Sequence, residues 1–447
     1  MQSEQSVEDW LKQNKITEVE CLVPDITGNA RGKFIPANKF VKEDSRLPEG
    51  ILAQTVTGEY SDDFWELLGT VDGDMLLEPD PSTMRSVPWA NEPTVQIIHD
   101  CFTKDGKPHP FSSRNVLKRI LALYEAEGLK PVIAPEVEFY LIEKNADPDA
   151  ALKPPIGRSG RYETARQSYS IDAANEFEDF VETMYSYGDA MGLDLDTLIH
   201  ESGAAQLEVN FIHGDPLDLA DQVFTFKRLA REAALKHNIY ATFMAKPMAS
   251  EPGSAKHIHQ SVLSLKDGSN IFATADGEYS EAFYHYLGGL QTYTPFVMSF
   301  FAPNVNSYRR FTREVAAPIN LHWGFDNRTT GLRVPDAAPK DYRIENRFPG
   351  ADVNPYLSIA ASLACGYLGL KKGIKPSEPF HGNAYNEEMQ MPRTLEEALR
   401  GLKEDSDIVE IFGSEFIQLY TSIKLVEFEE FNQVISSWER EFLLLTV

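Results

Sequence analysis

Two carboxylates lie within an apolar segment of the chain, VIAPEVEFYLI, which covers residues 132–142. Its branched and aromatic residues are typical of a buried strand, yet it contains Glu136 and Glu138. Side chains two residues apart on a strand point to the same face, and an ionised carboxylate is costly to bury unless it is paired or bound to a metal. The segment therefore indicates that positive charge lies between these two acids.

Three later segments alternate polar and apolar residues in the same way. Their polar residues are Gln206, Glu208 and Asn210 in AAQLEVNF, His257, His259 and Ser261 in KHIHQSVLSL, and Arg343, Glu345 and Arg347 in DYRIENRF. A single strand of this kind is usually the wet face of an antiparallel sheet. Four of them, with Glu201 nearby, favour two adjacent hard divalent ions such as Mg²⁺ or Mn²⁺.

Arginines are concentrated in a later stretch of the chain. Residues 309–347 contain Arg309, Arg310, Arg328, Arg333, Arg343 and Arg347. Their planar side chains suit phosphate and carboxylate oxygens, and arginines beside metal-bound carboxylates suit phosphoryl transfer from a nucleotide. No P-loop pattern occurs, so a nucleotide must be held in another way.

The overall charge excludes one large class of function. The 447 residues include 42 Lys and Arg against 68 Asp and Glu, a formal net charge of −26. Such a chain repels a phosphate backbone, so we expect no nucleic-acid partner. Residues 47–84 contain many acids and no Lys or Arg. This run is either a solvated surface or a region that attracts a cationic substrate.

The chain also lacks segments that direct proteins to or across membranes. The start, MQSEQSVEDW, has neither a basic flank nor an apolar core, and no apolar run approaches the length of a membrane span. Cys21, Cys101 and Cys365 are few, odd in number and far apart, which argues against a disulfide framework. We expect a cytoplasmic protein with no membrane partner.

The elements that must position these residues fall into two groups. The N-terminal part predicts short strands, namely a hairpin over 19–36 and strands over 74–82 and 94–100. Helices are predicted from Ser112 to Gly128, over 170–194 with its end at Gly192, and through most of the chain after Asn354. We therefore predict a small β-rich domain, residues 1–108, and a larger mixed domain, residues 109–447.

Seven segments together resemble the successive motifs of the glutamine synthetase family. They are PEVEFYL, HESGAAQLEVNF, FMAKPMASEPGSAKHIHQS, NSYRRF, NRTTGLRVP, PKDYRIENRFPGADVNPY and TLEEAL, and they occur in the family's order. The resemblance implies an α+β fold with a small β-grasp-like N-terminal domain. Beside it we expect a large catalytic domain with a curved antiparallel sheet flanked by helices. The resemblance also implies a homo-oligomer of two stacked hexameric rings, with active sites between subunits.

The resemblance assigns roles to individual residues. Glu138, Glu201 and Glu208 would hold one metal ion, and Glu136, His257 and Glu345 the second. Gly253, Arg310 and Arg347 would bind glutamate, Arg328 would bind phosphate, and His259, Ser261, Arg333, Lys340 and Arg343 would bind ATP. The implied reaction forms γ-glutamyl phosphate from glutamate and ATP, after which an amine displaces the phosphate.

Two departures from the family pattern concern the amine. Family members that use ammonia carry Glu where this chain has Ala316, and Asp where it has Thr55. Without these acids the site would suit a bulkier amine. VTGEY, DNR and ENRFPGADVNPY look most like the γ-glutamylpolyamine synthetase branch, which joins glutamate to putrescine, cadaverine, spermidine or spermine. Glu59 and Glu314 are then candidates for the cation site or the base, against the alternative of plain surface charge.

Three alternatives stay open at this point. The first is ordinary glutamine synthesis from ammonia, with Glu314 replacing the missing acids. The second is ligation of a monoamine such as ethanolamine or an alkylamine, and the third is a non-catalytic family member. Some bacterial members are modified on the tyrosine of an NLYDLP loop; Tyr385 in NAYNEEMQMP is a loose match, whose context argues against that regulation.

Overall fold

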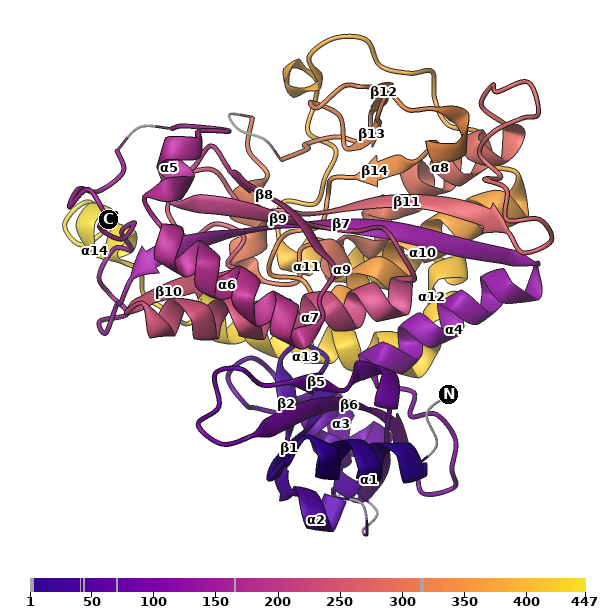
Figure 1. The fold of residues 1–447 in the computed structure, drawn as a ribbon. Helices are drawn as coiled ribbons and strands as arrows, with labels where there is room; N and C mark the ends of the chain where they lie inside the picture. Colours follow the sequence, from indigo (N-terminus) through magenta and orange to yellow (C-terminus); the bar gives the residue numbers. More distant parts are fainter. Residues whose placement is uncertain (1–3, 41, 43–44, 70, 165, 314–316) are drawn as a thin grey trace.

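The computed structural model describes residues 4–40, 42, 45–69, 71–164, 166–313 and 317–447 (Figure 1). The chain forms two sheets that belong to different parts of the sequence. Six strands before residue 103 form the smaller sheet, and eight strands between residues 129 and 346 form the larger one. A layer of helices lies between the larger sheet and the N-terminal part of the chain (Figure 1).

The smaller sheet contains β1 (Glu18–Pro24), β2 (Ala30–Pro36), β3 (Ser45–Pro48), β4 (Asp74–Pro79), β5 (Arg85–Ser86) and β6 (Thr94–Phe102). Its order is β2-β1-β6-β4-β3, with β5 paired to β6. Among the described strands of this smaller sheet, only the pair β1–β6 is parallel. The predicted hairpin is confirmed as β1 and β2. Its turn needs Gly28, which has φ +85°, and a Cβ there would lie 2.9 Å from the Cα of Asn354.

The larger sheet contains β7 (Leu129–Glu143), β8 (Leu195–His200), β9 (Gln206–Phe211), β10 (Ile239–Thr242), β11 (Lys256–Ser264), β12 (Trp323–Phe325), β13 (Leu332–Val334) and β14 (Ile344–Asn346). Its order is β12-β13-β14-β11-β7-β9-β8, and β10 pairs with β7. Neighbouring described strands are antiparallel except for the parallel pair β12–β13. The segment DYRIENRF therefore supplies a shorter strand than predicted.

The helices of the N-terminal part are α1 (Glu4–Gln13), α2 (Ala37–Phe40) and α3 (Asp62–Leu68). Those of the larger part are α4 (Ser113–Ala126), α5 (Ile171–Asn175), α6 (Glu178–Met191), α7 (Pro216–Lys236), α8 (Glu281–Tyr293), α9 (Met298–Phe301), α10 (Pro355–Lys372), α11 (Leu395–Glu404), α12 (Ser406–Phe412), α13 (Ser414–Asn432) and α14 (Ser437–Phe442). The helix predicted over 170–194 is two helices, because Phe177 turns into the core between α5 and α6. Gly192 ends α6 in the left-handed conformation, as predicted.

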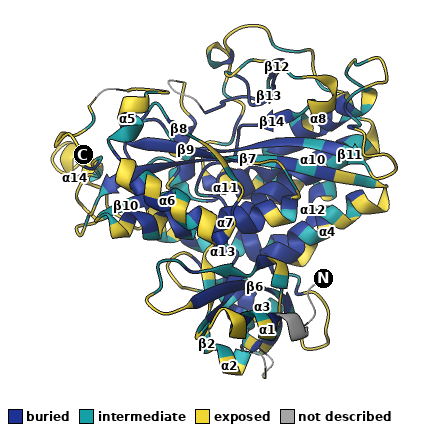
Figure 2. Cartoon of the chain, in the orientation of Figure 1, coloured by how far each residue is buried: buried dark blue, intermediate teal, exposed yellow. Residues whose placement is uncertain are grey.

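The two faces of β7 have opposite roles. Val137 and Phe139 are fully buried, and the ring of Phe139 lies 6.0 Å from that of Phe226 on α7. The helices α4 and α7 pack on this face (Figure 1), and the layer between the sheet and the helices is largely buried (Figure 2). Glu136 and Glu138 alternate with these residues and therefore point to the other face of the sheet.

The expected α+β class is confirmed, with two mixed sheets flanked by helices. The larger sheet is not wholly antiparallel, because β12 runs parallel to β13. The domain boundary between residues 108 and 109 falls in the connection from β6 to α4 and stays a prediction. Among the described residues, no helix is both long and apolar enough to span a membrane.

A buried ionic network joins the N-terminal part to the helices. Arg114 on α4 has a side chain only 1% exposed, and its guanidinium contacts three carboxylates. The nitrogen–oxygen distances are 2.7 Å to Asp80, 2.6 Å to Asp100 and 2.8 Å to Asp221. Asp221 also accepts a hydrogen bond from the hydroxyl of Tyr356 on α10. One cation therefore connects the smaller sheet, α4, α7 and α10.

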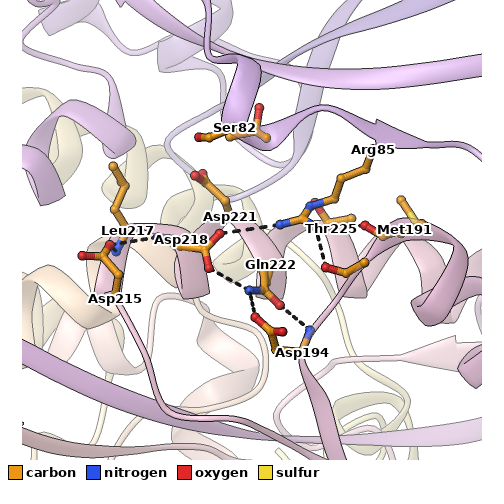
Figure 3. Close-up of polar contacts among 12 residues, drawn as sticks. Ser82, Arg85, Met191, Asp194, Asp215, Leu217, Asp218, Asp221, Gln222 and Thr225 are labelled. Carbon is orange, nitrogen blue, oxygen red and sulfur yellow. Dashed lines mark hydrogen bonds and ion pairs between the residues drawn. The ribbon is translucent and has the colours of Figure 1, made fainter. Parts of the chain in front are cut away.

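A second polar contact between the same parts is formed by β5 (Figure 3). Arg85 donates hydrogen bonds to the carbonyl oxygens of Met191 and Gly192, at 2.9 and 2.8 Å, and lies 3.6 Å from a carboxylate oxygen of Asp218. Gln222, one turn further along α7, donates to Asp218 and Asp194. The end of α6 is therefore tied both to β5 and to α7.

We expect Arg114→Ala to destabilise the protein by about 3–5 kcal/mol, because it leaves three buried or half-buried carboxylates without their shared cation. The measurement is the urea midpoint of unfolding. The control is Arg400→Ala, which breaks a surface pair with Glu396 and should change stability by only about 0–1 kcal/mol. Equal effects of the two substitutions would contradict the role of the network.

Candidate active site

The larger sheet brings the predicted polar residues into one row across its strands. In the register, Glu208 lies opposite Glu138, Asn210 and His257 lie on either side of Glu136, and Glu345 lies between His259 and Arg333. These residues come from β9, β7, β11, β14 and β13 in that spatial order. Segments up to two hundred residues apart thus meet on the face of the sheet away from α4 and α7.

Two groups of ligand atoms in this row could each hold a metal ion. Glu136, His257 and Glu345 form the first group, and Glu138, Glu208 and His257 form the second; the ligand atoms within each group lie within 4.8 Å of one another. The first group contains the residues expected for one of the two ions. The second contains His257 and does not include Glu201, which was expected there.

His257 belongs to both groups of ligand atoms. Its Nδ1 is 3.1 Å from a carboxylate oxygen of Glu136 and 3.6 Å from one of Glu345. Its Nε2 is buried and has no hydrogen-bond partner among the described residues. A buried imidazole nitrogen of this kind is a suitable ligand for a divalent ion, so the donor set fits two Mg²⁺ or Mn²⁺ ions.

For Glu138 and Glu201, near β7 and β9, burial outweighs the nearby positive charge of Arg347. Burial raises the pKa of Glu138 to about 8, and the nearby Glu201 carboxylate acts in the same direction. Burial and the charges of Glu136 and Glu138 raise the pKa of Glu208 well above its ordinary value. Burial likewise raises the pKa of Glu201. A cation bound between these groups would favour their ionised forms.

The acids on the β11–β14 side are balanced by protein cations. Burial opposes ionisation of Glu345, but the Arg347 guanidinium and the two nearby imidazoles lower its pKa to about 2. One carboxylate oxygen of Glu345, Oε2, lies 2.8 Å from a guanidinium nitrogen of Arg333. Burial also opposes ionisation of Glu136, yet hydrogen bonds from His257 and His259 hold its pKa far below the ordinary value. The need for a bound cation is therefore greatest beside Glu138 and Glu208.

A cavity of about 940 Å³ adjoins the row at Glu136. Its lining includes every residue expected to contact ATP or its phosphates, namely His259, Ser261, Arg328, Arg333, Lys340 and Arg343. It also includes Asp196, Asn210 and His213, which sequence reasoning did not select as site residues. Asn210 lay on the polar face of a predicted strand, and its Oδ1 is buried without a partner among the described residues. This cavity is large enough for a nucleotide.

The residues expected to bind glutamate lie near Glu138, to which Gly253 is linked through the side chain of Gln206. Arg310 is buried at the end of the 3₁₀ helix Val305–Arg310 and donates to the carbonyl oxygens of Arg347 and Phe348, at 3.0 and 2.6 Å. A Cβ on Gly253 would lie 2.6 Å from the Arg310 Cγ, so this close approach requires glycine. The three expected residues are therefore neighbours.

Gln206 connects this region to the acids and was missed as a site residue. Its Nε2 lies 3.0 Å from the Gly253 carbonyl oxygen and 3.3 Å from a carboxylate oxygen of Glu138. Its Oε1 accepts a hydrogen bond from the backbone of Gly203. The signal was its position on the same alternating strand as Glu208, but an amide there also fits an ordinary polar face.

The residues expected to select the amine are not gathered with the others. Thr55 is fully buried, its hydroxyl contacts that of Thr57 at 2.9 Å, and Glu59 is exposed. The same segment binds α13, where Glu427 accepts a hydrogen bond from the Val56 backbone. This contact lies on the helical side of the larger sheet, away from the row of acids (Figure 1). Glu314 and Ala316 lie outside the described residues.

The fold and the site define a class of ATP-dependent ligase. Residues 110–443 match the family model described as "Glutamine synthetase, catalytic domain". The chain therefore belongs to the glutamine synthetase family.

Curated relatives cover nearly the whole chain. It is 34% identical to the glutamate–isopropylamine ligase of a Pseudomonas species, over 97% of this chain and 96% of the relative. It is 33% identical to the gamma-glutamylputrescine synthetase PuuA of Escherichia coli K12, over 98% and 94%. The glutamine synthetase of Pyrococcus woesei is also 33% identical, over 94% and 92%.

Solved structures show the same extent of similarity. "Apo GmaS without ligand" superposes with a TM-score of 0.85 at 27% identity, covering 100% of both chains. "GmaS/ADP complex-Conformation 1" gives 0.86 at 27% identity, covering 99% of this chain and 100% of that one. The similarity therefore includes the N-terminal part as well as the part that matches the family model.

When divalent ions are removed with EDTA, we expect the protein to lose stability as pH rises from about 5 to 8. The pKa of Glu138 is about 8 in the folded protein, against 4.5 for an unperturbed glutamate side chain. Because the folded protein binds this proton more tightly than the unfolded chain, the proton increases the free energy of unfolding. This contribution is fully present below pH 4.5 and is lost as pH rises through about 8. Glu138→Gln should weaken this dependence, whereas Glu396→Gln on the surface should not. Denaturant midpoints across this pH range test the expectation, and an unchanged dependence in Glu138→Gln would contradict it.

Proposed function

We propose that this protein joins the γ-carboxylate of glutamate to a primary amine of a polyamine, such as putrescine, cadaverine, spermidine or spermine, with cleavage of ATP to ADP and phosphate. The observation that carries the proposal is the continuity of three regions. A cavity lined by Arg328, Arg333, Lys340 and Arg343 reaches the row of acids at Glu136, and Gly253, which adjoins Arg310, is linked to Glu138 through Gln206. This order suits a nucleotide, a metal pair and an amino-acid substrate in line.

Each region has a role in the proposed reaction. His259, Ser261, Arg333, Lys340 and Arg343 bind ATP, and Arg328 binds the phosphate that is transferred. Five residues of the row, namely Glu136, Glu138, Glu208, His257 and Glu345, would hold two Mg²⁺ or Mn²⁺ ions together with Glu201 from the loop between β8 and β9. When bound, these ions would neutralise charge on the phosphates and on the carboxylates. Gly253, Arg310 and Arg347 bind glutamate and direct its γ-carboxylate toward the nucleotide.

The reaction has two steps. An oxygen of the glutamate γ-carboxylate attacks the terminal phosphorus of ATP, the bond to the β-phosphate oxygen breaks, and ADP leaves. The neutral amine then attacks the γ-carbonyl carbon, phosphate leaves, and the amine proton passes to a base. Arg310 and Arg328 stabilise the negative charge that develops in these steps. Glu314 or Glu59 is proposed as the base, and Glu59, Thr55 and Ala316 as the residues that face the amine.

Several observations support a polyamine over smaller amines. Thr55 and Ala316 remove two acids that family members use with ammonia, and residues 47–84 supply a region of negative charge that suits a long cation. One relative is named as a γ-glutamylputrescine synthetase. Another is named for isopropylamine, which makes a monoamine ligase the main alternative, and glutamine synthesis is the other.

The position of the amine-selecting segment supports an oligomer. Within one chain, Val56 and Thr57 contact α13, and the backbone of Glu59 donates a hydrogen bond to the Thr55 hydroxyl. Family members are oligomers, and we propose two stacked hexameric rings in which this segment completes the site of a neighbouring subunit. We also propose a cytoplasmic location, in agreement with the three buried, unpaired cysteines.

Phosphate release from ATP tests this function, with glutamate and Mg²⁺ present and one amine added at a time. We expect turnover with putrescine, cadaverine, spermidine or spermine and little with ammonium. Turnover with ammonium alone would favour glutamine synthesis. Turnover only with isopropylamine or ethanolamine would favour a monoamine ligase, and no turnover with any amine would favour a non-catalytic role.

The missing acids generate a separate expectation. The double substitution Thr55→Asp with Ala316→Glu should raise kcat/KM for ammonium about tenfold or more, because two carboxylates can then bind the small cation. The matched control is Thr55→Asn with Ala316→Gln, which has the same shape without charge. If the control gains as much ammonium activity as the acidic pair, the proposed basis of amine choice is wrong.

A further inference from the structure

The loop that carries Glu201 is held by a carboxylate from a distant part of the sequence. This acid loop, residues 201–205, connects β8 to β9. One oxygen of Glu163 lies 3.1 Å from the Nε2 of His200 and accepts a hydrogen bond of 2.8 Å from the Ala205 backbone. Glu163 therefore contacts the residues at both ends of the turn that contains Glu201.

The burial of these groups indicates a built contact and not a surface encounter. The side chain of Glu163 is only 5% exposed, and that of His200 is fully buried. The other ring nitrogen of His200 is 2.7 Å from the carbonyl oxygen of Glu201, so the imidazole connects the Glu163 carboxylate to the backbone of the acid itself. Hydrogen bonds between buried charged and polar groups define geometry more strictly than exposed ones.

The acid loop needs external support because its own conformation is unfavourable. Ala205 has φ +57°, a region that residues with a Cβ rarely adopt. Two further contacts act together with Glu163. The backbone nitrogen of Tyr169 donates to the His200 carbonyl oxygen at 2.8 Å, and Glu251 accepts a hydrogen bond from Ala204 at 3.1 Å.

Glu201 is also the expected metal ligand whose position depends most on a loop. Glu136, Glu138, Glu208, His257 and Glu345 lie on strands of the larger sheet and belong to the two groups of ligand atoms, whereas Glu201 belongs to neither. The backbone nitrogen of Glu201 donates a hydrogen bond of 2.8 Å to the carbonyl oxygen of Gln206, whose side-chain Nε2 lies 3.3 Å from a carboxylate oxygen of Glu138. The acid loop therefore adjoins Glu138, but Glu201 itself is not anchored on a strand.

We propose that Glu163 is a positioning residue for this metal site: it fixes the acid loop at His200 and Ala205 so that Glu201 is presented to the ion held by Glu138 and Glu208. This inference rests on the proposed function, because it assumes that the row of acids binds divalent ions. Glu163 is not itself a ligand in this scheme. Through Glu163, the affinity for the ion held by Glu138 and Glu208 would depend on the segment that precedes α5.

Binding of Mn²⁺ alone, followed by electron paramagnetic resonance of the free ion, tests the proposal without substrates. We expect the unsubstituted protein to bind two Mn²⁺ ions, and Glu163→Ala to raise the dissociation constant of one of them about 10- to 100-fold. Glu163→Gln keeps an oxygen that can accept the same hydrogen bonds, so it should bind both ions nearly as well as the unsubstituted protein.

The matched control is Glu176→Ala, at the C-terminal end of α5, whose carboxylate accepts a hydrogen bond from the backbone of Ser159. It should bind both ions normally. If Glu163→Ala does not fold, Glu163→Asp provides the same test, because a side chain one carbon shorter does not span both donors. Equal affinity of Glu163→Ala and unsubstituted protein, or equal loss in Glu163→Gln, would overturn the positioning role. An unsubstituted protein that binds no Mn²⁺ would instead contradict the proposed function, and with it this inference.

Discussion

The arrangement of the site depends on one electrostatic constraint: several carboxylates lie on one partly buried face of a sheet, and each needs a cation. Carboxylates this close cannot all ionise without compensation. The chain meets the constraint unevenly. Arg333, Arg347 and two histidines surround Glu345 and Glu136, while Glu138 and Glu208 have no comparable partner among the described residues. The negative charge of Glu138 and Glu208 is therefore the part of the row that a bound cation would neutralise.

That constraint also explains the surroundings of the row. The opposite face of β7 is apolar and packs on α7, which fixes the strand so that its acids cannot move apart. Basic residues line the cavity beside Glu136, where under the proposed function an anionic nucleotide would bring its own negative charge. Positively charged side chains therefore lie next to the negatively charged row, so that each part of the site attracts groups of the opposite charge.

Much of this could be predicted from the sequence, because strand periodicity places alternate residues on one face whatever the tertiary structure. The acids of β7, the polar face of β9 and the histidines of β11 were found in this way, and the helix ends at Gly128 and Gly192 follow from glycine's access to positive φ. Contacts that depend on how residues far apart in the sequence are arranged in space could not be found. Gln206 and Glu163 act through geometry between distant residues, and the break at Phe177 reflects packing that overrides helix periodicity.

The use of both faces of β7 limits how this protein can change over evolutionary time. Insertion of one residue before Glu136 would turn its carboxylate toward α7 and bring apolar side chains to the polar face. Deletions would have the same effect, so the length of this strand is fixed as firmly as its composition. The segment around Thr55 is less constrained than β7. It contacts α13 through the backbone nitrogen of Val56 and the hydroxyl of Thr57. Under the proposed function, a change of amine would therefore arise in this segment while the strands that carry the acids stay unaltered.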